Sequence, residues 1–109
     1  MHQRLEQLPE LLGQLPRASK KDVDVVYIIQ ALDGGPVKIG HSTREGVTNR
    51  LRTLQTGNAQ QLVIRALFSG GMWLEKALHE FFAESRLKGE WFSLTPELLA
   101  MCPEADVGR

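Results

Sequence analysis

Four residues carry side chains that could do chemistry together: Tyr27, Lys38, Arg50 and Glu75. The planar guanidinium of an arginine suits a phosphate on which charge develops during transfer. A single carboxylate, completed by water and substrate oxygens, can hold a hard divalent cation. A lysine ammonium beside a tyrosine favours the phenolate and would lower the phenol pKa from about 10. These residue types suit phosphoryl chemistry if the fold brings them together.

Patterns typical of several other sites are missing. The sequence has no P-loop, no G-x-G-x-x-G, no paired C-x-x-C and no H-E-x-x-H. Its histidines do not combine with the one cysteine, Cys102, in a zinc-binding spacing. His79 follows Glu75 by four residues, so on a helix the two share a face, where His79 could orient a phosphate or water. His41 follows Gly40 and could assist proton transfer.

The segments around these residues predict a small α+β domain. Its sheet is expected to be three-stranded, mostly antiparallel and flanked by helices. The domain is expected to span residues 23–102, after a helical appendage and linker over 1–22 and before a tail over 103–109. The expected elements, in order, are a helix over 9–15, strands over 23–31 and 37–40, a helix from about 47 to 56, a strand over 61–68, a helix over 72–87, an extended piece over 90–93 and a helix from 96.

Two apolar patterns predict which faces are buried. In the helix over 72–87, apolar residues at helical spacing predict a core stripe, made of Leu74, Ala77, Leu78, Phe81 and Phe82. In the strand over 61–68, alternation places Leu62, Ile64 and Ala66 on one face.

Length and composition exclude some classes of protein. A chain of 109 residues suggests one domain, and 42% hydrophobic residues argue against disorder over its whole length. No apolar run reaches the roughly 18 residues that a membrane span needs, and no secretory signal pattern is visible. The single cysteine fits a cytoplasmic protein. The net charge is zero, but residues 34–65 hold five basic residues and one acidic residue, which indicates either a polyanion site or a solvated surface.

Several sequence blocks together resemble a known family. Val25-Val26-Tyr27 followed by Lys38-Ile39-Gly40 resembles the two signature tripeptides of the GIY-YIG nuclease superfamily, which lie on a β-hairpin with about this spacing. Further blocks over 50–58, 74–82 and 89–92 follow in order. They are similar to a phage- and bacteria-associated branch, and Lys38 stands where most members have the second tyrosine.

The resemblance implies metal-dependent hydrolysis of DNA phosphodiester bonds. Tyr27 would be a general base or would position the attacking water, and Arg50 would bind the scissile phosphate. Glu75 would bind one divalent cation, Mg²⁺ or Mn²⁺. Arg44 and Arg52 would contact backbone phosphates. Low sequence specificity is expected, since no second DNA-binding module accompanies the domain.

Departures from the family pattern leave other interpretations open. No asparagine follows Asn58, although many members carry one after the long helix, and Glu90 could fill that place. One alternative is a nucleic-acid-binding module without efficient cleavage. Another is an interaction domain whose N-terminal helix forms homo-oligomers or binds a partner protein. Individually, Tyr27 could be a core aromatic, and Arg50 could simply pair with Glu45 or Glu75.

Overall fold

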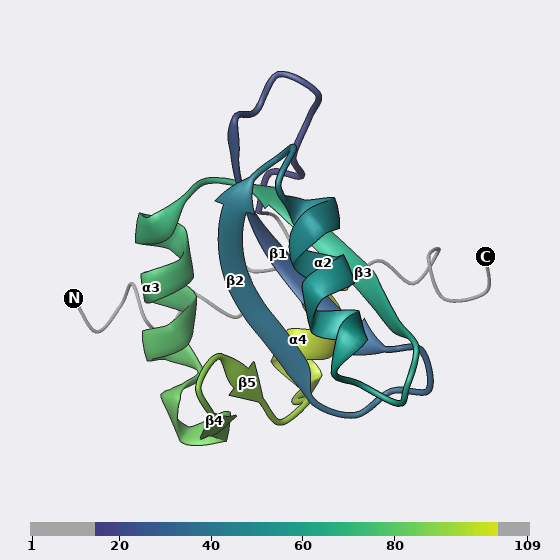
Figure 1. Ribbon diagram of the computed structural model, residues 1–109. Coiled ribbons are helices and arrows are strands. Elements are labelled where there is room, and N and C mark those ends of the chain that lie inside the picture. Colours follow the sequence, from purple (N-terminus) through teal and green to yellow (C-terminus); the bar gives the residue numbers. More distant parts are fainter. Residues whose placement is uncertain (1–14, 103–109) are drawn as a thin grey trace.

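The computed structural model describes residues 15–102, which form a five-stranded antiparallel sheet with three helices (Figure 1). The strand order is β3-β1-β2-β5-β4. The strands are β1 (Asp24–Ala31), β2 (Val37–Thr43), β3 (Leu62–Ser69), β4 (Arg86–Lys88) and β5 (Trp91–Phe92). The helices are α2 (Val47–Thr56), α3 (Met72–Phe81) and α4 (Pro96–Met101), with a 3₁₀ turn at Ala83–Ser85. The expected α+β class is therefore confirmed.

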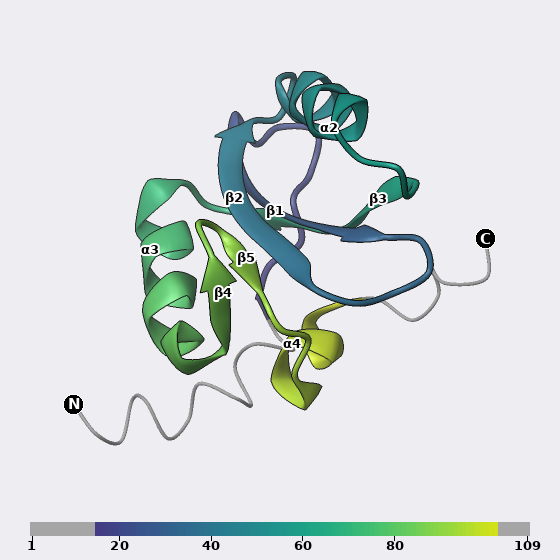
Figure 2. The same ribbon diagram turned by 60° about the horizontal axis from the view of Figure 1, so that its bottom comes forward.

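The sheet separates two layers of helices, α2 on one face and α3 with α4 on the other (Figure 2). Alternation along β1 supplies both cores, because successive side chains of a strand point to opposite faces. Tyr27 and Ile29 face α2 and pack against its residue Val47. Val26 and Ile28 face the opposite side, where α3 and α4 lie. The central strand is thus buried on both sides, which explains its nearly continuous apolar run.

A β-bulge in β3 changes which side chains share a face. Ile28 pairs with Ala66 and Ile29 pairs with Ile64, so Arg65 is an extra residue in the ladder. Ala66 therefore lies in the core under α3, while Ile64 packs on the α2 side. The expectation that Ala66 shares a face with Ile64 was wrong, because simple alternation fails across an inserted residue.

The C-terminal half differs most from the sequence-based expectation. The sheet has five strands instead of three, and α3 ends at Phe81 instead of continuing to Leu87. The two additional strands have three and two residues, too few to show a strand periodicity. They form a hairpin that turns at Gly89, whose φ of 57° suits a residue without a side chain. The expected core stripe is confirmed at Leu74, Leu78 and Phe82, and Phe81 packs against the core. Ala77 is exposed instead, and Glu75 is buried.

The segment before β1 lies along the outer edge of β3. The Ala18 amide donates to the Leu67 carbonyl at 3.0 Å, and the Ser69 amide donates to the Pro16 carbonyl at 2.9 Å. The Arg17 guanidinium lies 4.6 Å from the centre of the Phe68 ring. The helix predicted over 9–15 lies almost wholly outside the described residues, as does the predicted tail. Within residues 15–102, no helix has the length and apolarity needed to cross a membrane.

Candidate active site at the edge of β2

Tyr27 and Gly40 form the floor of the site. They are cross-strand partners on β1 and β2, and the Tyr27 ring lies directly over Gly40. A Cβ at position 40 would stand 2.5 Å from Tyr27 Cζ and closer still to the hydroxyl. Tyr27 as a residue is only 1% exposed, yet its hydroxyl has no hydrogen-bond partner among residues 15–102. The hydroxyl is therefore available to a water or a phosphate oxygen.

Burial raises the pKa of Tyr27 to about 12. The charge of Arg50 opposes this increase, while the charges of Glu90 and Glu75 add to it. The expectation that Lys38 would lower this pKa was wrong, because the Lys38 ammonium pairs with Glu90 instead. The phenol is therefore neutral near pH 7 and can act as a hydrogen-bonding group but not as a phenolate base.

Alkaline titration should report this shift directly, because Tyr27 is the only tyrosine in the chain. Ultraviolet absorbance should show phenolate forming near pH 12 in the folded protein and near pH 10 in denaturant. Since folding raises this pKa, its contribution to stability is complete below pH 10 and is lost as the pH rises through 12. A folded-state midpoint near pH 10 would contradict the burial argument. The Tyr27→Phe variant, which has no phenol, gives the background absorbance.

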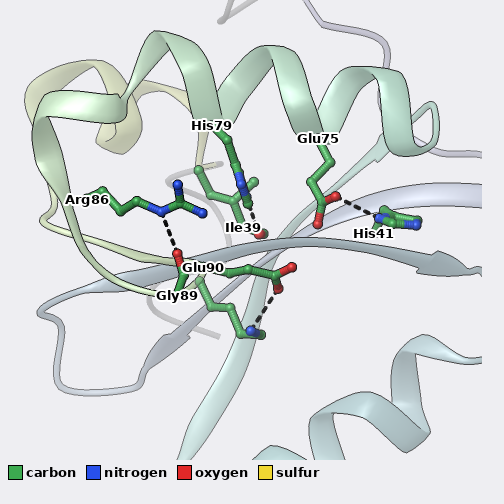
Figure 3. Close-up of polar contacts among 8 residues, drawn as sticks. Ile39, His41, Glu75, His79, Arg86, Gly89 and Glu90 are labelled. Carbon is green, nitrogen blue, oxygen red and sulfur yellow. Dashed lines mark hydrogen bonds and ion pairs between the residues drawn. The ribbon is translucent and has the colours of Figure 1, made fainter.

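Glu75, which is buried, pairs with the partly exposed His41 across the β2 edge. The His41 Nδ1–H donates to Glu75 Oε1 at 2.9 Å, as Figure 3 shows. Glu75 is 7% exposed and lies in the first turn of α3, where the helix dipole favours a negative charge. Because a buried carboxylate needs such partners, the alternative of an ordinary surface glutamate does not apply. The pair leaves the second carboxylate oxygen of Glu75 and the Nε2 atom of His41 available for other contacts.

His79 ties α3 to β2. Its Nε2–H donates to the Ile39 carbonyl at 2.8 Å, and its ring lies 5.0 Å from that of Phe92 (Figure 3). These contacts occupy one face and one nitrogen of the imidazole. In this structure His79 therefore fixes the position of the helix that carries Glu75, one turn away.

Glu90 is the residue of this site that the sequence indicated least. Its Oε1 lies 2.8 Å from Lys38 Nζ, and its carbonyl accepts from the Ile39 amide at 3.0 Å. Burial alone would raise the pKa of Glu90. The hydrogen bond and the charge of Lys38 instead hold this pKa below its ordinary value. Figure 3 shows the Glu75 and Glu90 carboxyls reaching into the same space. The only sequence signal was an acid in place of a missing asparagine.

Arg50 approaches from α2. It lies exposed in an open pocket of about 290 Å³, lined by Ser42, Gly46, Asn49, Arg50 and Thr53. Within residues 15–102 the ion pairs are Lys38–Glu90 and His41–Glu75, so Arg50 does not pair with Glu45 or Glu75 there. Its guanidinium is therefore available to an anion.

The two other predicted phosphate contacts lie apart from this pocket. Arg52 Nη1 donates to Asn49 Oδ1 at 2.8 Å, and Arg52 does not line the Arg50 pocket. Arg44 follows the last residue of β2, and its backbone amide donates to the Val23 carbonyl at 2.7 Å. The structure thus brings together Tyr27, Lys38, His41, Arg50, Glu75, His79 and Glu90 around the β2 edge, with Arg44 at its end.

This arrangement can bind an anion beside a cation. Arg50 supplies the positive side, and Glu75 with Glu90 supplies the negative side. No group of three or more metal-ligating side chains is found among the described residues. Two carboxylates suffice for a hard cation that keeps several waters, as Mg²⁺ does.

Comparison with known proteins assigns the family. The model of the T5orf172 domain matches residues 24–105, about three quarters of the chain. No curated protein and no solved structure matches the chain. Domains of the matching family are often nuclease-like. The match corrects the identification with the GIY-YIG nuclease superfamily, which rested on short separated blocks, because the whole domain is assigned to a different family. The chain belongs to the T5orf172 domain family.

Proposed function

We propose that this protein is a metal-dependent endonuclease that hydrolyses DNA phosphodiester bonds with low sequence specificity. The observation that carries the proposal is the convergence of three kinds of group at the β2 edge. These are the neutral hydroxyl of Tyr27, the exposed guanidinium of Arg50, and the carboxylates of Glu75 and Glu90. Membership of a family whose domains are often nuclease-like supports the same conclusion.

The donor set fits one Mg²⁺ or Mn²⁺ ion. Glu75 and Glu90 each have one carboxylate oxygen in a short polar contact, with His41 and Lys38 respectively, and one further oxygen. Ligating carboxylates are commonly held by such outer hydrogen bonds. When bound, the cation would stabilise the charge that develops on the scissile phosphate and its leaving oxygen.

The protein's own side chains would bind the phosphate, orient the attacking water and accept its proton. Arg50 would bind and neutralise the scissile phosphate. The Tyr27 hydroxyl would hydrogen-bond to the attacking water and orient it. His41, whose Nδ1–H is held by Glu75, would accept the water proton at Nε2 while the water oxygen bonds to phosphorus. The bond from phosphorus to the leaving oxygen then breaks, and that oxygen takes a proton from solvent.

A cleavage assay tests the proposal. The protein would be incubated with supercoiled plasmid and with branched DNA, in Mg²⁺, in Mn²⁺ and in EDTA. We expect nicking that requires metal and that falls on the order of 10²–10³-fold in Arg50→Gln, since one charge-stabilising group is lost. Lys88→Gln, an exposed charge on β4, is the control and should cut normally. Equal cutting by Arg50→Gln and wild type would contradict the proposed site.

One observation favours a second candidate, a DNA-binding module without efficient cleavage. Lys38 is held by Glu90, and Tyr27 remains neutral, so neither supplies a ready base. This candidate predicts binding that weakens with salt and no product in either metal.

A further inference from the structure

A second basic site lies beyond the end of β2. A pocket of about 300 Å³ is lined by three basic residues, two acidic ones and two others: Lys20, Lys21, Arg44, Asp22, Glu45, Val23 and Thr43. Its lining comes from the segment before β1, from the last residue of β2 and from the turn that follows β2. The two segments lie side by side at one end of the sheet (Figure 1). None of the residues assigned to the cleavage chemistry lines this pocket.

The turn that carries the two lysines is anchored by Asp22. The Ser19 amide donates to Asp22 Oδ2 at 2.7 Å, and the Ser69 hydroxyl donates to Asp22 Oδ1 at 3.1 Å. The Asp22 amide in turn donates to the Ser19 carbonyl at 3.1 Å. Lys20 and Lys21 thus project from a closed turn fixed to β3, and both are exposed.

The charges of this pocket favour an anion. Neither lysine nor Arg44 takes part in an ion pair among the described residues. The Asp22 charge is already satisfied, because the Ser19 amide, then the Ser69 hydroxyl and more weakly the charge of Arg44 hold the pKa of Asp22 below its ordinary value. Arg44 Nη1 is buried without a hydrogen-bond partner in residues 15–102. An unsatisfied guanidinium N–H of this kind calls for an acceptor.

The position of the pocket suits the backbone of a bound nucleic acid. Thr43 and Arg44, which line this pocket, directly follow Ser42 at the end of β2. Ser42 lines the Arg50 pocket, to which the scissile phosphate is assigned. The second pocket therefore adjoins the first, so a DNA backbone that passes Arg50 can bring a further phosphate to Arg44.

We propose that Lys20, Lys21 and Arg44 bind DNA backbone phosphates next to the scissile one. The inference rests on the proposed function only in taking DNA as the partner. The site would position the duplex across the β2 edge and would carry no sequence information.

The test measures DNA binding in EDTA, so it does not depend on cleavage. The affinity for a 30-base-pair duplex would be followed by fluorescence anisotropy between 50 and 300 mM salt. We expect Lys20→Gln/Lys21→Gln to flatten the slope of log affinity against log salt by about 1.8, since two phosphate contacts are lost. The matched control Lys76→Gln/Lys88→Gln removes the same charge from exposed positions on α3 and β4 and should keep the wild-type slope. Arg44→Gln should flatten the slope by about 0.9.

The outcomes separate this site from the proposed function. A flattened slope in a protein that cuts nothing supports the phosphate site and contradicts only the cleavage. A wild-type slope in the lysine variant, or equal flattening in the control, overturns the site even if cleavage is found. Inorganic phosphate serves as the competing probe. If it stabilises the wild type but not the lysine variant, and the DNA slope is unchanged, the site binds a free anion and the assignment to DNA is overturned.

Discussion

Replacing Glu75 with glutamine is expected to lower metal-dependent cleavage on the order of 10³-fold while leaving the fold intact. Glutamine has nearly the same shape, and its carbonyl oxygen can still accept from His41 Nδ1–H. It loses the negative charge that a hard cation requires. The measurement is the rate of plasmid nicking at saturating Mg²⁺ and Mn²⁺, with thermal unfolding followed in parallel.

A graded pair of variants distinguishes a ligand from its support. His41→Asn removes the hydrogen bond to Glu75 and should cost on the order of 10–100-fold, as for other partners of metal ligands. Mn²⁺ binding to the protein, followed by electron paramagnetic resonance, should be lost in Glu75→Gln and only weakened in His41→Asn. If Glu75→Gln binds Mn²⁺ and cuts like the wild type, Glu75 is not the metal ligand.

The positions of the central elements were predictable because their signals are local. The apolar run of β1, the turn at Gly34 and Gly35, and the helix ending before Gly57 each depend on neighbouring residues. The hairpin places Tyr27 opposite Gly40, and α2 follows directly, so the approach of Arg50 could also be anticipated.

The contacts that decide the chemistry were not predictable in the same way. Glu90 reaches Lys38 only because β5 pairs with β2, and β5 is two residues long. The direction of the Tyr27 pKa shift also depends on three dimensions. Burial of the phenol raises this pKa, and Lys38, which was expected to lower it, lies against Glu90 instead. Burial of Glu75 depended on the rotation of α3 against β2, which the hydrogen bond from His79 to Ile39 fixes.

Replacing Gly40 with alanine is expected to destabilise the protein by about 1–3 kcal/mol and to reduce cleavage with it. The φ of Gly40 is not positive, so an alanine meets no backbone strain there. The cost is steric, because the new Cβ would overlap the ring of Tyr27, which is buried and has no flexible end to yield. For a domain of this size, this loss lowers the melting temperature by roughly 4–8 °C per kcal/mol.

Two comparisons assign this cost to the contact with Tyr27. Gly57→Ala is the matched control, because a Cβ at position 57 meets nothing within 4 Å, and it should be neutral or slightly stabilising. In a Tyr27→Leu background, which lacks the Cζ and hydroxyl atoms, Gly40→Ala should cost much less. The two substitutions should therefore be coupled by about 1–3 kcal/mol. An equal cost of Gly40→Ala in both backgrounds would mean that Gly40 does not hold the tyrosine. The position of the phenol at the β2 edge would then need another cause.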